Sequence, residues 1–326
     1  MENTALILVA DIGGTNARFA LAQPQQQTLT LEYNHTIPSA SATSLEALIQ
    51  QYLAWLPSEI KIQGACLALA GPVIEQSVNL TNLGWSSSAE VLEQAFDFPV
   101  VLINDFVAYA NSLPALNNDQ LVSLKSGKAV ADAPVLVLGP GTGFGMAVLQ
   151  PAINGHYRPY ASEGGHIRLA AYTELQQALI AQGRLQTDHV SIEHFLCGPG
   201  LVNLYQALAA HLQQTPELNT AAEITKAALD NSSTLAKQTL SCFCYWLGQV
   251  VGDLVLAHGA LGGVVLGGGI LPRIVPFIQK SEFVVGFSNN LAMHKYLSPV
   301  PIQLAMKSDT ALIGALLWWL QQTNHR

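Results

Sequence analysis

The sequence has few charged residues and no cluster of positive ones. Asp, Glu, Lys and Arg make up 11% of its 326 residues, and the formal net charge is −8. Proteins that bind nucleic acid through its phosphates need a basic surface, so we expect no nucleic-acid partner. Hydrophobic residues reach 50%, which excludes a disordered chain and is enough to fill the cores of about two domains.

The N-terminus lacks the features of a secretory signal. No basic region precedes the apolar stretch Leu6–Val9, which is also too short. A longer apolar stretch, Tyr245–Ile270, is interrupted by several glycines and by two titratable residues. We interpret it as a buried helix that ends at Gly259, followed by a strand over Gly263–Leu266. We therefore expect a cytoplasmic protein without membrane contact.

The sequence is also poor in cysteine. Its four cysteines are Cys66, Cys197, Cys242 and Cys244, and only the last two are close in sequence. A lone C-x-C without a second pair does not match the spacing of zinc ligands. We expect buried, reduced thiols, as is usual in cytosolic proteins.

The hydrophobic pattern alternates between strands and helices, which is typical of an α/β protein. The strands are predicted at Ala5–Ala10, Asn16–Ala22, Thr28–Thr36, Ala65–Ala70, Val100–Ile103, Pro134–Leu138 and Met146–Gln150. The helices are predicted at Ser44–Trp55, Ser88–Phe96, Gly200–Leu212, Ala221–Leu229, Thr234–His258 and from Asp309 through Trp319. Each half of the chain opens with strand, glycine turn and strand. No low-complexity linker separates the halves, so we expect them to share a cleft.

The first glycine turn follows the first predicted strand and reads DIGGTNAR from Asp11. Gly13 and Gly14 allow a tight turn and bring backbone N–H groups close to an anion. Thr15 adds a hydroxyl donor, and Asp11 could hold Mg²⁺ through water. Alone, the motif also fits a hairpin turn without a ligand.

Two further glycine turns follow later strands. Gly139–Gly145 matches neither the dinucleotide fingerprint nor the P-loop, because a strand follows it and no lysine is present. Two glycine hairpins in a duplicated pattern suit a nucleotide whose phosphates are held from both halves. The third turn contains Gly267–Gly269, whose backbone could lie flat against adenine or ribose. Taken alone, each of these two turns could equally be a connection between secondary-structure elements that binds no ligand.

Polar residues follow strands or glycines at three places. Asn104 and Asp105 end a short apolar strand, where α/β sheets place ligands. Glu163 and His166 flank two glycines, and Glu193 comes later. Carboxylates and imidazoles suit sugar hydroxyls, because they accept and donate hydrogen bonds. Taken singly, each of these residues also has a purely structural explanation. Asp105 could be a helix N-cap, His166 could be a structural histidine, and Glu193 could be a surface charge.

Taken in order, the motifs DIGGTNAR, INDF, GPGTGFG, EGGH, GPGLVNLY and GGGIxPR resemble the bacterial glucokinase family of the hexokinase–actin–Hsp70 superfamily. The resemblance implies an α/β, two-domain ribonuclease-H-like (actin-type ATPase) fold with an interdomain cleft. Residues 1–110 would form a small domain completed by helix 309–326, and residues 111–308 a large domain. It also implies a cytoplasmic, usually homodimeric enzyme of glycolysis that uses ATP and Mg²⁺ to phosphorylate glucose at the 6-hydroxyl.

The resemblance also implies roles for individual residues. Asp105 would be the general base, and the sugar ligands would be Asn104, Asp105, Glu163, His166 and Glu193. The phosphate-binding residues would be Ala10, Asp11, Ile12, Gly13, Gly14, Thr15, Gly141, Thr142 and Gly143. The adenosine side would be formed by Gly267, Gly268 and Gly269.

Other functions on the same fold remain open. The chain could phosphorylate another hexose or an amino sugar. A non-catalytic sugar sensor would be expected to carry a DNA-binding extension ahead of the first strand and has no need of Asp105. A related group of kinases and repressors has a cysteine-rich zinc motif after its glutamate–histidine segment, and Ile167–Thr173 contains no cysteine. An actin- or Hsp70-type ATPase would lack the N-D and E-G-G-H motifs.

Overall fold

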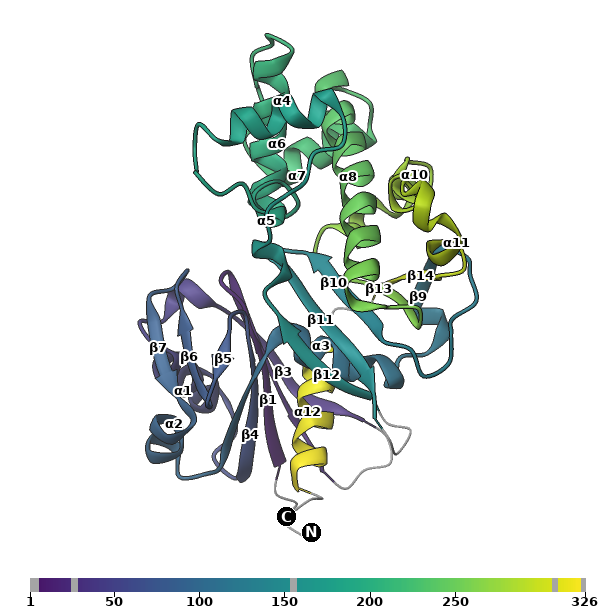
Figure 1. Ribbon diagram of the computed structural model, residues 1–326. Coiled ribbons are helices and arrows are strands. Elements are labelled where there is room, and N and C mark those ends of the chain that lie inside the picture. The colour runs from purple at the N-terminus through teal and green to yellow at the C-terminus, as the bar shows by residue number, and fades with distance from the viewer. Residues whose placement is uncertain (1–5, 25–28, 153–156, 307–309, 324–326) are drawn as a thin grey trace. The chain divides into compact units, whose positions relative to one another are not determined.

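The computed structural model describes residues 6–24, 29–152, 157–306 and 310–323 (Figure 1). The chain divides into two compact units. The first contains residues 1–117, 157–161 and 307–326, and the second contains residues 118–156 and 162–306. Each unit is built around one mixed sheet, and the predicted site residues are distributed over both.

The sheet of the first unit has the order β3-β2-β1-β4-β8. β1 (Leu6–Ile12) pairs antiparallel with β2 (Asn16–Ala22), which pairs antiparallel with β3 (Leu31–Pro38). On its other side β1 is parallel to β4 (Ile62–Leu69), and β4 is parallel to β8 (Val100–Asn104). The carboxyl ends of β1, β4 and β8 therefore meet at one edge of the sheet.

Helices supply a separate core to each face of this sheet. α1 (Leu45–Trp55) and α2 (Ala89–Phe96) join the cluster that contains Leu8 of β1. The neighbouring Val9 points the other way and joins the cluster of α3 (Asp105–Ser112) and α12 (Thr310–Thr323). Both faces of β1 are thus buried, which explains its continuous apolar sequence. Asp309, the predicted start of the last helix, lies outside the described residues.

A small antiparallel sheet in the first unit was not expected from the sequence. Its strands, in the order β5-β6-β7, are β5 (Val73–Ile74), β6 (Ser77–Leu80) and β7 (Trp85–Ser88). These strands have two to four residues each. Runs this short do not establish a period of two, so the alternation test misses them.

The six-stranded sheet has the order β12-β11-β10-β13-β14-β9, and all of its strands except β12 belong to the second unit. Its strands are β9 (Leu121–Lys125), β10 (Val135–Pro140), β11 (Phe144–Pro151), β12 (Tyr157–Ser162), β13 (Gly263–Leu266) and β14 (Ile302–Ala305). β10 pairs antiparallel with β11 and parallel with β13, and β13 is parallel to β14. The arrangement of β10, β11, β13 and β14 therefore repeats that of β1, β2, β4 and β8 in the first unit.

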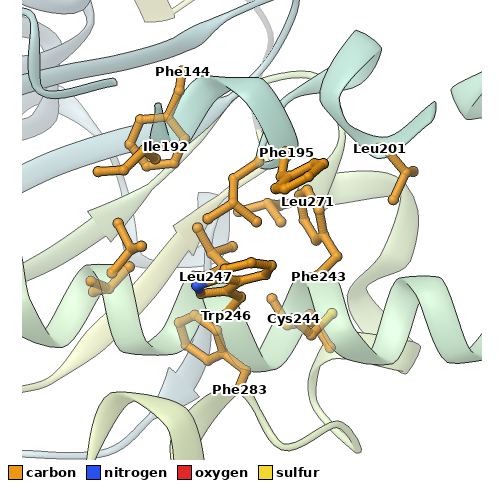
Figure 2. Packing of buried hydrophobic residues seen from close by; sticks show 14 of the residues in the cluster. Phe144, Ile192, Phe195, Leu201, Phe243, Cys244, Trp246, Leu247, Leu271 and Phe283 are labelled. Atoms are coloured by element: carbon orange, nitrogen blue, oxygen red, sulfur yellow. The ribbon is translucent and has the colours of Figure 1, made fainter. Parts of the chain in front are cut away.

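The second unit also contains eight of the α-helices that the structure describes. They are α4 (Glu174–Gly183), α5 (Ile192–Phe195), α6 (Gly198–His211), α7 (Ala221–Leu229), α8 (Thr234–His258), α9 (Val275–Ile278), α10 (Phe283–Phe287) and α11 (His294–Leu297). α8 is the long helix beside α10 in Figure 1, and Gly259 ends it in the left-handed conformation (φ 61°). Its Trp246 is fully buried and tilts against Phe195 of α5, as Figure 2 shows.

α8 is the one helix within the described ranges that is long and apolar enough to span a membrane. In the structure 67% of its most apolar window is buried. Its bounds and its glycine end match the prediction of a buried helix followed by the strand Gly263–Leu266. The hydrophobic character of α8 is accounted for by the core that it fills.

All four cysteines are free, as predicted. Cys66, Cys197 and Cys244 are buried, and Cys242 is half-buried. Burial raises the pKa of the Cys242 and Cys244 thiols to about 12, because an apolar environment disfavours the thiolate. These thiols are therefore protonated and unreactive at neutral pH.

Candidate active site

The first glycine turn connects β1 to β2 at the edge where the parallel strands end. The N–H of Gly13 donates to the carbonyl of Asn16 at 3.0 Å and closes the turn. The hydroxyl of Ser39 donates to the carbonyl of Gly13 at 2.7 Å. A Cβ atom on Gly14 would meet nothing closer than the Asn82 side chain at 3.8 Å, an ordinary contact, so the turn is not tightly packed there. Hydrogen bonds thus fix the backbone of this turn on one side, and its other side remains accessible, as an anion-binding site requires.

Asn104 and Asp105 lie at the same edge, because Asn104 is paired with Leu69 at the end of β4. The side-chain oxygen of Asn104 caps α3 by accepting from the N–H groups of Phe106 and Val107 at 2.9 and 3.1 Å. Its amide donates to the carbonyl of Gly71 at 3.1 Å. The N-cap is therefore Asn104 rather than Asp105. Asp105 occupies the first helical position, where a negative charge is favoured.

Asp11 is the acidic residue of the first turn, and it lies opposite Arg18 in the β1–β2 pairing. Burial raises the pKa of its carboxyl above the ordinary value, and the Arg18 guanidinium at 3.9 Å offsets this only in part. A quarter of the side chain remains exposed. Asp11 is thus a carboxylate whose charge the protein does not fully compensate, and a nearby cation would stabilise it.

The second glycine loop is a tighter hairpin than the sequence indicated. Gly139 pairs with Gly145 and Pro140 with Phe144, so β10 and β11 extend into the motif and leave residues 141–143 as the turn. The N–H of Gly141 donates to the carbonyl of Gly143 at 2.7 Å. A Cβ atom on Gly141 would have its nearest neighbour at 3.9 Å. This turn is also not tightly packed at its first glycine.

The third glycine segment packs directly against this hairpin. A Cβ atom on Gly139 would come within 2.3 Å of the carbonyl oxygen of Gly267. Gly268 has a φ of 84°, and a Cβ there would lie 2.3 Å from the carbonyl oxygen of Pro140. Only glycine permits two backbones to approach so closely. The structure thus brings the predicted phosphate and adenosine segments of the second unit together.

The main chain of Phe144 joins this loop to two predicted sugar ligands. Its N–H donates to Oε2 of Glu193 at 2.7 Å. A Cβ atom on Gly165 would lie 2.2 Å from its carbonyl oxygen, so the turn between Glu163 and His166 packs on the start of β11. Glu193 is half-buried in α5, and the expectation of a plain surface charge does not hold.

Glu163 and His166 remain open to solvent. Their side chains are 51% and 65% exposed, and the imidazole Nε2 lies 4.0 Å from the Glu163 carboxylate. His166 is therefore not a satisfied structural histidine. The Glu163 carboxylate is available to accept hydrogen bonds from a ligand, and the His166 imidazole can donate or accept them.

A cavity of about 510 Å³ opens next to Gly269. It lies against α7 and is lined by Thr225 and Lys226, with Arg273 on the other side. Lys226 is also paired with Asp230 at 2.9 Å. A volume of this size suits a small-molecule ligand.

The sequence did not indicate the residues that line this cavity. It also did not indicate the groups that form hydrogen bonds with the predicted site residues. Gly71 follows β4 and carries the carbonyl that holds Asn104. Its signal was the pair Gly71-Pro72 directly after a predicted strand. Arg273 ends the GGGIxPR motif, but Lys226 is an ordinary surface residue in sequence, and no local pattern distinguishes it.

The described residues fit a magnesium nucleotide. Among them, no group of three or more His, Cys, Asp or Glu side chains could hold a metal ion by itself. Mg²⁺ is commonly bound by one or two carboxylates together with substrate phosphates. Asp11 is an under-compensated carboxylate, and the open glycine turns at Gly14 and Gly141 could receive phosphates.

Comparison with known proteins identifies close relatives. Residues 8–322 match the family model described as Glucokinase. A glucokinase from Saccharophagus degradans is 39% identical over 313 residues, which cover 95% of this chain and 97% of that protein. The crystal structure of a glucokinase from an Antarctic psychrotroph has a TM-score of 0.82 and 44% identity, and the match covers 97% of this chain and 99% of that one.

The fold extends to more distant sugar kinases. A ROK family glucokinase from Streptomyces griseus, in complex with glucose and AMPPNP, has a TM-score of 0.68 at 17% identity. The match covers 96% of this chain and 98% of that one. At this identity the likeness concerns the mixed α/β fold alone.

Proposed function

The chain belongs to the glucokinase family, and we propose that it transfers the γ-phosphoryl group of ATP to the 6-hydroxyl of glucose. One observation carries this proposal beyond the family relationship. The main chain of Phe144 contacts both Glu193 and the Glu163–His166 turn, directly beside the glycine loop. Groups suited to sugar hydroxyls therefore lie next to backbone suited to phosphate, as a sugar kinase requires.

In the proposed reaction, Asp105 accepts the proton of the 6-hydroxyl while that oxygen attacks the γ-phosphorus. The new O–P bond forms as the bond from phosphorus to the β–γ bridging oxygen breaks, and ADP leaves. The hydrogen bonds of Asn104 to α3 and to Gly71 hold the end of β8 in place. Asp105 is thereby positioned by the strand and by the helix that starts there.

The second unit would bind the remaining groups of both substrates. Glu163, His166 and Glu193 would pair with sugar hydroxyls, and Gly141–Gly143 would receive phosphate oxygens at backbone N–H groups. The cavity beside Gly269 would take the adenosine. Mg²⁺, held by the phosphates and by Asp11 through water, would neutralise the negative charge of the transferred group.

We also propose the finer fold assignment that the resemblance implies. Both units have an antiparallel hairpin followed by two parallel strands, in the orders β2-β1-β4-β8 and β11-β10-β13-β14. This repetition supports a ribonuclease-H-like, actin-type ATPase fold. The division into a small domain, completed by the C-terminal helix, and a large domain that close on sugar and MgATP is part of the same proposal.

The cellular setting is proposed on the same basis. The enzyme would work in the cytoplasm as a homodimer and supply glucose 6-phosphate to glycolysis. Light scattering of the purified protein would test the dimer. A monomeric mass at assay concentrations would contradict it.

The choice of sugar can be tested by comparing four substrates. A polar group that the bound sugar covers but that lacks its hydroxyl partner costs about 1–3 kcal/mol, so glucose should exceed mannose, galactose and N-acetylglucosamine by about tenfold or more in kcat/KM. Glu163→Gln should lower activity and narrow this gap. The measurement is ADP release in a coupled assay, on both proteins. A preference of the unmodified protein for galactose or N-acetylglucosamine would show a kinase for another sugar.

A further inference from the structure

The second unit contains another cavity, away from the glycine loops. It has a volume of about 510 Å³ and lies between α4 and the segment that follows the Glu163–His166 turn. Arg168 and Arg184 line it, with Gln177 and Asp188. None of the roles proposed above uses these residues.

The charges of this cavity are not balanced. Asp188 is the only acidic residue in its lining, against two guanidiniums. Within the part of the chain that the structure describes, neither Arg168 nor Arg184 forms an ion pair. Two arginines thus line one cavity on a chain with a net charge of −8, and guanidiniums bind tetrahedral oxyanions through paired N–H groups.

We propose that this cavity binds a phosphoryl group, either as free phosphate or as a phosphate monoester. The terminal nitrogens of Arg168 and Arg184 would hold the anion from two sides, and the amide of Gln177 would donate a further hydrogen bond. Asp188 offsets one of the two arginines, so a single negative charge balances the lining. A phosphoryl group differs from chloride because its separate oxygens can accept hydrogen bonds from both guanidiniums.

A chain of hydrogen bonds connects this cavity to the sugar-binding turn. The Nε–H of Arg168 donates to Nδ1 of His189 at 3.3 Å. Nε2 of His189 lies 2.7 Å from the carbonyl oxygen of His166. The two contacts are satisfied together when His189 is neutral and carries its proton on Nε2, because Nδ1 must accept and Nε2 must donate.

Anion binding should therefore tighten glucose binding. The anion would bind the terminal nitrogens of Arg168, so the Nε–H of Arg168 would keep its hydrogen bond to His189. An ordered Arg168 guanidinium would therefore fix the position of His189, and His189 would in turn fix the carbonyl of His166. This coupling rests on the proposed role of His166 as a sugar ligand. Binding linkage is reciprocal, so glucose should strengthen phosphate binding by the same factor.

The test uses the full-length enzyme at saturating MgATP and fixed free Mg²⁺. We expect inorganic phosphate or glycerol 2-phosphate, with chloride balancing ionic strength, to lower KM for glucose about fivefold, at the modest end of allosteric couplings, with kcat unchanged. Arg184→Gln should abolish this response and keep the activity without anion. Lys237→Gln removes one positive charge from α8, outside the cavity, and should respond like the unmodified protein.

The outcomes separate this proposal from the proposed function. If glucose is phosphorylated but neither anion changes KM, the anion site is wrong and the kinase assignment stands. An equal response in Arg184→Gln would place the effect at another site and overturn the proposal. A response to phosphate alone supports a site for the free ion, and a response to both supports one that also accepts esters.

Discussion

At the scale of single residues, the main chain of Phe144 connects the two halves of the candidate chemistry in the second unit. Its N–H holds Glu193, and its carbonyl leaves room only for glycine at position 165. Any movement of the glycine hairpin is therefore transmitted to groups proposed to bind the sugar. Phosphate and sugar binding should be coupled through this contact.

The role of Asp105 as general base can be tested by a substitution that leaves the neighbouring structural residue in place. Asp105→Asn removes the proton acceptor, and Asn104, the residue that caps α3, is unchanged. We expect kcat to fall by about 10² or more, the usual scale for losing a general base, while glucose still binds by calorimetry. Asp97→Asn, at an exposed left-handed position, is a matched control. Near-normal turnover in Asp105→Asn would refute the assignment.

The phosphate turn is best tested at Gly141. The Cβ of a valine there would not clash, because the nearest atoms to an added Cβ are 3.9 Å away or more. The fold should be preserved, and KM for ATP should rise about tenfold or more, equivalent to about 1.4 kcal/mol. The affinity for glucose, measured without nucleotide, should change little.

Gly143 is a less selective probe of the same turn. A Cβ atom there would lie 2.5 Å from the Glu193 carboxylate, so Gly143→Val should weaken ATP and glucose together. If Gly141→Val left KM for ATP unchanged, the turn would have only a structural role.

At the scale of elements, α12 and α3 cross closely in the first unit. A Cβ atom on Gly314 would lie 1.7 Å from the carbonyl oxygen of Ala108. The amide of Asn111 donates to the carbonyl of Gly314 at 3.0 Å and fixes the crossing. The same glycine that weakens α12 as an isolated helix is thus required for its packing.

This crossing makes a prediction about stability. In an isolated helix, Gly314→Ala would gain up to about 1 kcal/mol. Against α3, overpacking should cost more than this gain, and we expect a net loss of about 1–3 kcal/mol in urea unfolding. Gly71→Ala is the control, since its added Cβ would meet Leu80 at an ordinary 3.6 Å. Equal stability of the two variants would contradict the close packing.

At the scale of the whole molecule, the proposed site draws on both units. Asp11, Asn104 and Asp105 belong to the first unit, and Glu163, His166 and Glu193 belong to the second. Transfer of a phosphoryl group to a sugar rather than to water requires these groups to act together with solvent excluded. We therefore predict that sugar binding closes the protein.

Closure can be measured in solution. Glucose should slow limited proteolysis and reduce the radius of gyration in small-angle scattering, because a closed enzyme is more compact. L-Glucose, which has the same composition, serves as the control. Identical profiles with and without glucose would indicate a rigid, preformed site.

Local features were predictable from the sequence, because residues close along the chain determine them. The bounds of α7, α8 and β13 match the prediction. Ser44, where this helix was predicted to begin, caps α1 and accepts the N–H of Ala47. Glycine turns after apolar strands were found by the same kind of local pattern, and so was the strand end that carries Asn104.

Tertiary structure alone decided which distant groups meet. The bond from Phe144 to Glu193 joins residues 49 positions apart, and the pair Gly139–Gly267 is separated further still. The cavity residues Arg168 and Arg184 likewise have no shared local signal. Such contacts depend on how elements pack, and the energy of packing is a property of surfaces that no short stretch of sequence contains. The sequence therefore determined the chemistry available to this protein, and the packing decided which of those groups can act together.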